Sequence, residues 1–135
     1  GGTDEHLEVL PVEGFAAMMP AVAEEFPGIR VVATTLRRVV SATVNDWGAL
    51  GWSAETGVIE ATHRPGLEIL DRVGGGDSFA SGLAYGLLQG EDLALALEYG
   101  AAHGALAMTT PGDTSMASLK EVEALVRGAG ARVER

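Results

Sequence analysis

The sharpest feature of the sequence runs from residue 71 to residue 82 and reads Asp-Arg-Val-Gly-Gly-Gly-Asp-Ser-Phe-Ala-Ser-Gly. In it, Gly74, Gly75 and Gly76 lead directly into Asp77 and a helical pattern. The first N–H groups of a helix have no partner within the helix, and the helix dipole favours an anion beside them. Glycine lets an anion approach that backbone without meeting a Cβ atom. The stretch therefore predicts an anion cradle over residues 74–77.

Asp77 needs its own explanation, because a carboxylate inside an anion cradle repels the anion. Two roles fit the residues: an N-cap whose carboxylate turns back to the helix, or a general base that takes a proton from a hydroxyl attacking a phosphate. Neither Lys-Ser nor Lys-Thr follows the glycines, which argues against a P-loop, and the spacing does not fit a dinucleotide-binding Gly-x-Gly-x-x-Gly.

Helical patterns flank this stretch on both sides. Four segments place apolar side chains near helical spacing: residues 13–26, 78–88, 91–108 and 118–128. Pro20 predicts a kink or a late start in the first helix. Ser118 and Glu121 form a capping box at the start of the last helix, which is expected to end at Gly128.

Strand patterns fill the region between the first two helices. Four segments rich in apolar and β-branched residues predict strands: residues 29–36, 39–44, 48–52 and 58–62. Residues 45–48 and 55–57 predict turns, and residues 63–66 predict a loop. The segment 29–36 is apolar on both faces, as in an interior strand covered by helices. The order of elements indicates an α/β fold with a central β-sheet flanked by helices.

Composition narrows the class of protein. The 135 residues suit one domain, and 47% are hydrophobic, enough for a real core. Nine Lys and Arg against nineteen Asp and Glu give a net charge of −10, which argues against nucleic acid and anionic membranes as partners. The absence of cysteine excludes disulfides and thiol catalysis and is compatible with a cytoplasmic protein. No apolar run is long enough to span a membrane, and residues 1–10 lack the features of a signal peptide.

The stretch 71–82 resembles the second signature of the ribokinase-like (PfkB) carbohydrate kinases: an Asp, two variable residues, Gly-Ala/Gly-Gly-Asp and a helix of small residues. The likeness continues through GLAYGLLQGEDLALALEYGAAHGALAMTTPGDTS. This segment, together with LRRVVSATVNDWGAL, is similar in sequence to the 2-keto-3-deoxygluconate kinase branch of the family. The resemblance covers nearly the whole chain and implies the C-terminal, nucleotide-binding half of a ribokinase-like layered fold, with the N-terminal half absent.

The resemblance implies a role for each matching residue. Asp77 matches the catalytic base that contacts the acceptor hydroxyl, and residues 74–76 match the anion hole that stabilises the transferring phosphoryl group. Asp71 matches a monovalent-cation ligand, although Arg72 and Val73 replace the usual Thr-Thr pair. Two further sets match nucleotide contacts, a strand end and small residues bordering the adenine: Thr34, Thr35, Leu36 and Arg37, and Ala101, Gly104 and Ala105. Arg37 stands where the family usually has glycine.

The implied function is ATP-dependent phosphorylation of a sugar hydroxyl, with Mg²⁺ as cofactor and K⁺ as a second cation. The implied substrate is 2-keto-3-deoxygluconate, converted to its 6-phosphate, and a homo-oligomer is left open. Three alternatives stand beside it: a PfkB kinase for another sugar or nucleoside, a nucleotide-binding fragment without catalysis on its own, and a glycine-rich scaffold that binds no ligand. The 135 residues alone are expected to be inactive.

Several of these residues also fit plain packing roles. The segment GAAHGALA at 100–107 can be a tight helix–sheet contact, and His103 within it can be a packing residue. Thr34 and Thr35 can be ordinary strand residues. Trp47 and Trp52 can belong to the strand core rather than to a sugar-stacking surface.

Overall fold

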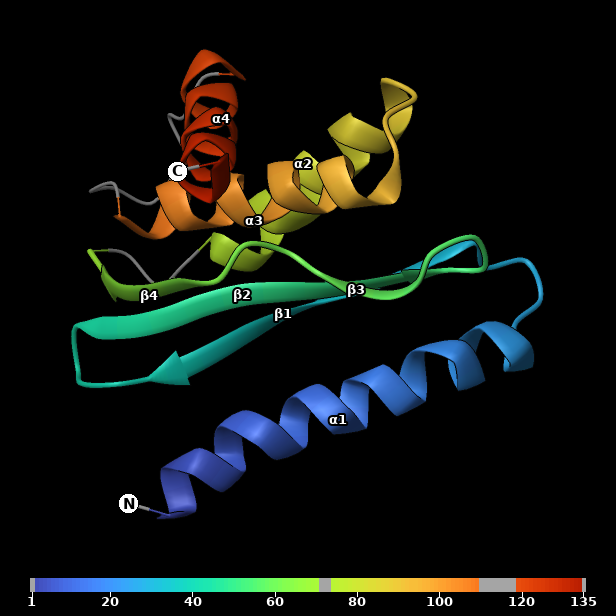
Figure 1. Ribbon diagram of the computed structural model, residues 1–135, viewed down its shortest axis with the longest axis horizontal. Helices are drawn as coiled ribbons and strands as arrows, with labels where there is room; N and C mark the ends of the chain where they lie inside the picture. The colour runs from blue at the N-terminus through green and yellow to red at the C-terminus, as the bar shows by residue number, and fades with distance from the viewer. Residues whose placement is uncertain (1, 71–73, 110–118, 135) are drawn as a thin grey trace.

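The computed structural model describes residues 2–70, 74–109 and 119–134 and shows one β-sheet with helices on both of its faces (Figure 1). In chain order the elements are α1 (Gly2–Glu25), β1 (Val31–Val39), β2 (Val44–Ser53), β3 (Gly57–Glu60), β4 (Arg64–Glu68), α2 (Gly75–Leu88), α3 (Leu93–Thr109) and α4 (Leu119–Glu134). This layered arrangement confirms the predicted α/β fold with a central sheet flanked by helices.

Strand β2 is the central strand of the described sheet, and all of its pairings are antiparallel. It pairs along its length with β1, from Val31 opposite Ser53 to Val39 opposite Asn45. The other edge of β2 is shared, because β3 pairs with residues 50–53 and β4 with residues 44–47. Within the described residues, the outer edge of β1 therefore carries no further strand.

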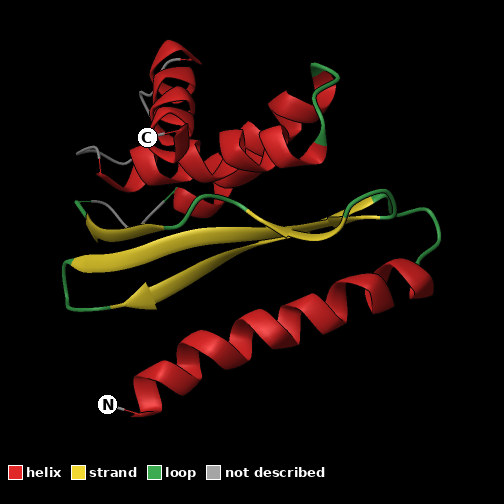
Figure 2. Ribbon diagram, viewed as in Figure 1, coloured by secondary structure: helices red, strands yellow, loops and turns green. Residues whose placement is uncertain are grey.

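Helix α1 covers one face of the sheet, and α2, α3 and α4 lie on the other (Figure 2). The core lies between β2 and α3, where small and large apolar side chains interlock: Trp47, Ala49, Leu97, Ala101, Ala105 and Met108. Helix α2 packs closely against α3 through glycines. A Cβ atom at Gly82 would lie 2.5 Å from the carbonyl oxygen of Tyr99, and one at Gly86 would lie 2.6 Å from Cα of Ala96. Neither site has room for a side chain, so this close approach requires glycine.

The predicted turn at residues 45–48 is wrong, because β2 runs through these residues as one strand. Asn45 and Trp47 point into the core, and the Asp46 carboxylate accepts a hydrogen bond from the Gly66 N–H at 2.9 Å. Asn45, Asp46 and Gly48, which are typical turn residues, therefore belong to a strand here. The turn lies earlier, at residues 40–43, where the Val40 N–H donates to the Val44 carbonyl at 2.9 Å.

The loop expected at residues 63–66 is also wrong, because β4 begins at Arg64 and includes Pro65 and Gly66. Proline is tolerated on an edge strand because that strand has one side without ladder hydrogen bonds. A register shift between Asn45 and Trp47 marks the place where β4 accommodates these residues.

Helix ends differ from the predicted ones by several residues. Helix α1 begins at Gly2 and continues past Pro20, so the expected late start is wrong. Helix α3 begins at Leu93, because the Asp92 carboxylate accepts a hydrogen bond from the Leu95 N–H at 2.9 Å and caps the helix. Helix α4 continues to Glu134 rather than ending at Gly128, and its predicted cap, Ser118, lies outside the described residues. None of the helices in the described ranges is long and apolar enough to cross a membrane.

Candidate active site

The chain enters α2 through a left-handed turn at Gly74, which has φ 95° and ψ −10° and serves as the N-cap. Glycine adopts this conformation readily. The Ser78 N–H donates to the Gly74 carbonyl at 2.8 Å, so the N–H groups of Gly75, Gly76 and Asp77 precede the first bond of the helix. Gly76 is exposed, and a Cβ atom there would meet nothing within 4 Å. The start of α2 thus has the open, donor-rich geometry that an anion cradle needs, and the binding of an anion there stays a prediction.

Asp77 is the third residue of α2, and its side chain is exposed. The N-cap position belongs to Gly74, and no side chain makes a capping hydrogen bond there. The interpretation of Asp77 as the N-cap is therefore wrong. The carboxylate is available to solvent at the first turn of the helix, as a general base acting on a bound hydroxyl would have to be. That role remains a prediction.

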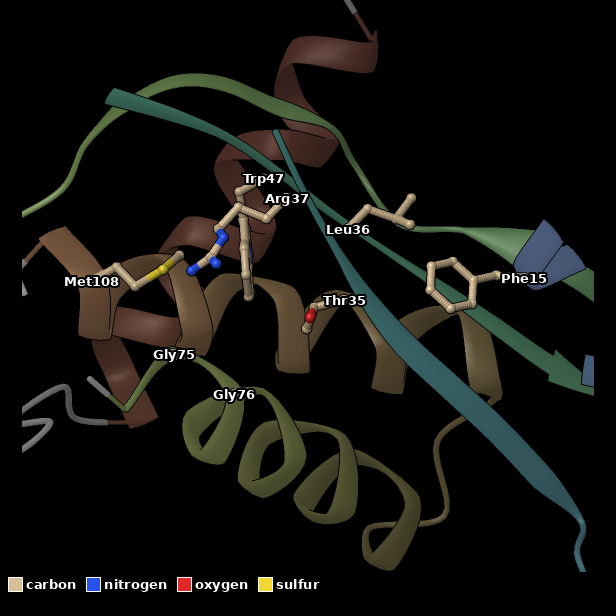
Figure 3. Close-up of a pocket in the computed structure, with 8 residues that line it drawn as sticks. All are labelled: Phe15, Thr35, Leu36, Arg37, Trp47, Gly75, Gly76 and Met108. Atoms are coloured by element: carbon tan, nitrogen blue, oxygen red, sulfur yellow. The ribbon is translucent and has the colours of Figure 1, made fainter. Parts of the chain in front are cut away.

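A pocket of about 440 Å³ opens beside the start of α2 (Figure 3). The residues that line it come from α1, β1, β2, α3 and the start of α2: Phe15, Thr35, Leu36, Arg37, Trp47, Gly75, Gly76 and Met108. The pocket therefore brings three of the predicted nucleotide contacts on β1 together with two of the predicted anion-hole glycines. Thr34, Gly74 and Asp77 are not among the lining residues, and the Thr34 hydroxyl donates to the Thr35 carbonyl at 3.3 Å.

Successive side chains of β1 point to opposite faces of the sheet, so they reach different parts of the pocket. Thr35 pairs with Ala49 and Arg37 with Trp47, so these two side chains lie on the face of the sheet that carries α2 and α3. Leu36 lies on the opposite face, where α1 supplies Phe15. Figure 3 shows the Arg37 guanidinium on the same side of the strand as Trp47 and Met108.

Arg37 is the charged residue among the described residues that line the pocket. Its neighbour Arg38 points to the other face, where its guanidinium lies 3.5 Å from the Asp46 carboxylate. In a chain with net charge −10, the pocket therefore combines one guanidinium with the positive end of α2. This local arrangement favours an anionic ligand despite the acidity of the chain.

Trp47 forms an inner wall of the pocket and is only 3% exposed. Its indole Nε1–H donates to the Ala101 carbonyl of α3 at 2.9 Å. The ring also lies against Gly104, where a Cβ atom would come within 2.6 Å of Cζ2 of Trp47. The tight helix–sheet contact considered for this segment is therefore present.

The three small residues of α3 predicted to border the adenine, Ala101, Gly104 and Ala105, are all buried and do not line the pocket. Their contact with a nucleotide stays a prediction. Trp52 pairs with Val32 toward the far end of β2 and does not line the pocket either. His103 is half-buried on the same helix. Burial lowers the pKa of His103, and a hydrogen bond with the Ser78 backbone partly opposes that shift. A neutral imidazole packed beside the start of α2 fits a structural residue.

Metal ligands are sparse in the part of the chain that the structure describes. No group of three or more His, Asp or Glu side chains there is arranged to hold a metal ion. Asp71, the predicted ligand for a monovalent cation, lies outside the described residues.

Sequence reasoning missed two lining residues. Phe15 lies on α1, far from the glycine-rich stretch in sequence, and Met108 lies at the end of α3. Both look like ordinary apolar positions of a helix, so the pattern contains no signal that they reach a pocket. Only the packing of α1 and α3 on opposite faces of the sheet shows it.

Comparison with known proteins shows the family and the fold of the chain. Residues 32–120 match the pfkB family of carbohydrate kinases, a span that includes all but the first residue of β1, the cradle and α3. The chain belongs to the pfkB family. The solved structure of 2-dehydro-3-deoxygluconokinase from Thermotoga maritima superimposes with a TM-score of 0.78 and 36% identity, over 86% of this chain and 35% of that chain. The family likeness therefore extends to the fold of nearly all of this chain.

Two curated relatives match shorter stretches of this pfkB-family chain. The 2-dehydro-3-deoxygalactonokinase of Haloferax volcanii is 38% identical over 68 residues, which make up 50% of this chain and 21% of the relative. The acarbose 7(IV)-phosphotransferase of an Actinoplanes species is 41% identical over 90 residues, 59% of this chain and 30% of the relative. The chain thus spans about a third or less of the length of each relative it matches.

Proposed function

We propose that the protein containing this chain is an ATP-dependent sugar kinase that phosphorylates a hydroxyl of 2-keto-3-deoxygluconate to give the 6-phosphate. The observation that carries the proposal is the pocket that joins Arg37 of β1 to Gly75 and Gly76 of α2. Family membership supports phosphoryl transfer to a carbohydrate. The likeness to the Thermotoga maritima 2-dehydro-3-deoxygluconokinase, whose name refers to the same sugar acid, supports the substrate.

In the proposed reaction, Asp77 removes the proton from the attacking hydroxyl of the sugar. The hydroxyl oxygen forms a bond to the γ-phosphorus of ATP while the bond from that phosphorus to the leaving oxygen of ADP breaks. The N–H groups of residues 75–77 stabilise the charge on the transferring phosphoryl group in the manner of an oxyanion hole. Arg37 holds the anionic part of the nucleotide in this proposal, and its position in the lining of the pocket supports that role.

The described residues fit a divalent ion that arrives with the nucleotide rather than one held by the protein alone. They contain no cluster of three or more metal-ligating side chains. Mg²⁺ in kinases commonly takes most of its ligands from phosphates and water, with one or two carboxylates from the protein. When bound, Mg²⁺ would neutralise phosphate charge, and Asp77 is the carboxylate of the cradle that could face it. K⁺ binding at Asp71 remains part of the proposal.

A second acceptor is favoured by a specific observation. One curated relative is named for 2-dehydro-3-deoxygalactonate and another for acarbose. Membership of the family is therefore compatible with more than one acceptor sugar. The alternative is therefore a kinase of the same mechanism with another sugar as acceptor.

The experiment measures ADP release by the complete protein with ATP and each of three acceptors: 2-keto-3-deoxygluconate, 2-keto-3-deoxygalactonate and glucose as a control sugar without a carboxylate. We expect kcat/KM to be highest for 2-keto-3-deoxygluconate and lowest for glucose. A higher value for the galactonate would select the alternative acceptor. The absence of ADP release above the sugar-free rate with all three would contradict the proposed function.

A further inference from the structure

The contact between α2 and α3 is built from glycines on both helices. Gly82 and Gly86 of α2 lie against Tyr99 and Ala96 of α3, and Gly100 of α3 lies against Phe79 of α2. At each of these three glycines a Cβ atom would come within 2.5–2.8 Å of the facing helix. The order of the pairs shows that the helices run antiparallel, so α3 passes the start of α2 one turn beyond Gly100.

Gly104 occupies that next turn, and it differs from the other glycines because it faces two parts of the pocket at once. A Cβ atom at Gly104 would lie 2.6 Å from Cζ2 of Trp47 and 3.0 Å from the carbonyl oxygen of Gly75. Trp47 is an inner wall of the pocket, and Gly75 is the first helical residue of the cradle. The bare backbone of Gly104 therefore fills the space between them.

Two further contacts fix the same pair of groups to the same face of α3. The Trp47 indole donates its hydrogen bond to Ala101, three residues before Gly104. Met108, four residues after Gly104, lies against Gly75, where a Cβ atom would come 2.9 Å from its sulfur. Figure 3 shows the Trp47 side chain extending from its strand toward the α3 ribbon. One helical face thus sets the separation between the pocket wall and the cradle.

We propose that Gly104 is a positioning residue for phosphoryl transfer, and that it acts by seating Gly75 and Trp47 at a fixed separation on α3. The inference rests on the proposed function of the cradle. It assigns Gly104 a role different from contact with the adenine, because its Cα is enclosed by Trp47 and Gly75 and does not line the pocket. A side chain at this position has to displace either Trp47 or Gly75, because the atoms that face it belong to a buried ring and to the backbone rather than to a flexible surface side chain.

The test compares Gly104→Ala with Gly100→Ala in the complete protein. Both changes add one methyl group to a buried face of α3, at 2.6 Å and 2.8 Å from the nearest facing atom, but only Gly104 touches the pocket wall and the cradle. We expect similar decreases in melting temperature for the two variants. A misplacement of about 1 Å near reacting groups can cost about a hundredfold in rate. We therefore expect kcat to fall about ten- to a hundredfold for Gly104→Ala and less than about threefold for Gly100→Ala.

A compensating change distinguishes positioning from general damage. Trp47→Phe removes Cζ2, the atom that a methyl group at position 104 would strike first. We expect the double variant Trp47→Phe/Gly104→Ala to have a higher kcat than Gly104→Ala alone, a non-additive result that independent structural losses would not produce.

A measurement that does not depend on kinase activity tests the role of Gly104 separately from the proposed function. In ¹H–¹⁵N spectra of the ligand-free protein, the amide signals of Gly75 and Gly76 should move in Gly104→Ala and stay near their wild-type positions in Gly100→Ala. Moved signals together with no kinase activity of the wild type would overturn the proposed function and keep the seating of the cradle. Equal kcat values for the two alanine variants, or unmoved Gly75 and Gly76 signals in Gly104→Ala, would overturn the inference.

Discussion

At the scale of single residues, the three glycines of the cradle have different tasks. Gly74 supplies the left-handed turn, with φ 95°, that directs the chain into α2. Gly75 faces inward, where a Cβ atom would come 2.9 Å from the Met108 sulfur. Gly76 faces open space. A substitution at Gly75 therefore disturbs packing and binding together, whereas one at Gly76 tests binding alone.

Gly76→Val should weaken phosphate binding while leaving the fold intact. The new side chain meets no protein atom at its Cβ but stands on the open side of the N–H groups that would hold the phosphoryl group. We expect kcat/KM for ATP to fall about tenfold or more, given that loss of a single oxyanion donor costs about 10²–10³-fold. The melting temperature should change by only a few degrees. Unchanged kinetics with a folded variant would remove the anion-hole assignment.

Asp77→Asn should separate catalysis from binding. The amide keeps the size of the carboxylate but cannot accept the proton of the attacking hydroxyl. A general base contributes about 10²–10⁴-fold to the rate, so kcat should fall by about that factor while the Kd for ATP stays within about threefold of the wild-type value. Because Asp77 is not the N-cap, only a small change in stability is expected. A variant that keeps more than about a tenth of the wild-type kcat would show that Asp77 is not the base.

At the scale of elements, β1 places two adjacent arginines on opposite faces of the sheet. Arg37 lies in the pocket opposite Trp47, and Arg38 lies opposite Asp46, with 3.5 Å between the guanidinium and the carboxylate. The period of two in a strand gives neighbouring residues of the same chemistry different environments. A substitution of Arg38 is therefore a matched control for the same substitution of Arg37.

Arg37→Gln should raise KM for ATP about tenfold or more, because a charge-assisted contact to an anion is worth about 1.5–3 kcal/mol. Arg38→Gln removes the same charge from the other face and loses an ion pair worth about 0–1 kcal/mol. Its KM should stay within about twofold of the wild-type value. Steady-state kinetics of the two variants, measured at one ionic strength, check this difference. Equal increases in KM would mean that Arg37 acts only through net charge.

Sequence reasoning worked where local chemistry decides the structure and failed where packing overrides it. The glycines and the small-residue helix after Asp77 indicate the start of a helix by themselves, and α2 begins there. Asn45 and Asp46 look like a turn, yet they belong to β2 because β1 and β4 pair on both sides of them. Phe15 reaches the pocket only because α1 packs across the sheet beneath Leu36. Contacts between distant segments of this kind leave no mark in a single sequence.

At the scale of the whole molecule, the described residues leave one edge of the sheet without a partner strand. Within the described residues β1 pairs only with β2, and the apolar residues Val39 and Val40 beside that edge are 56% and 55% exposed. Leu88 at the end of α2 is 84% exposed. The chain also spans only 35% of the Thermotoga maritima kinase it resembles. An open edge with exposed apolar residues is a site for association with other chains.

The 135 residues expressed alone should therefore self-associate and show no kinase activity. We expect light scattering to report species larger than a monomer, and Val39→Lys/Val40→Lys to reduce them, since charge on an edge strand blocks edge-to-edge pairing. A stable monomer with a cooperative melt would contradict the association. Sugar-dependent ADP release by this chain alone would place the sugar site within it.

The most direct test of the anion cradle is an experimental structure of the complete protein with a non-hydrolysable ATP analogue. We expect an oxygen of the γ-phosphate to accept hydrogen bonds from the N–H groups of Gly75 and Gly76, at the usual N···O distance of about 2.7–3.2 Å. We also expect the Arg37 guanidinium to lie beside the bound nucleotide, in the pocket that both glycines line. Phosphates bound away from the start of α2, with the cradle N–H groups facing only water, would contradict the proposed role of the cradle.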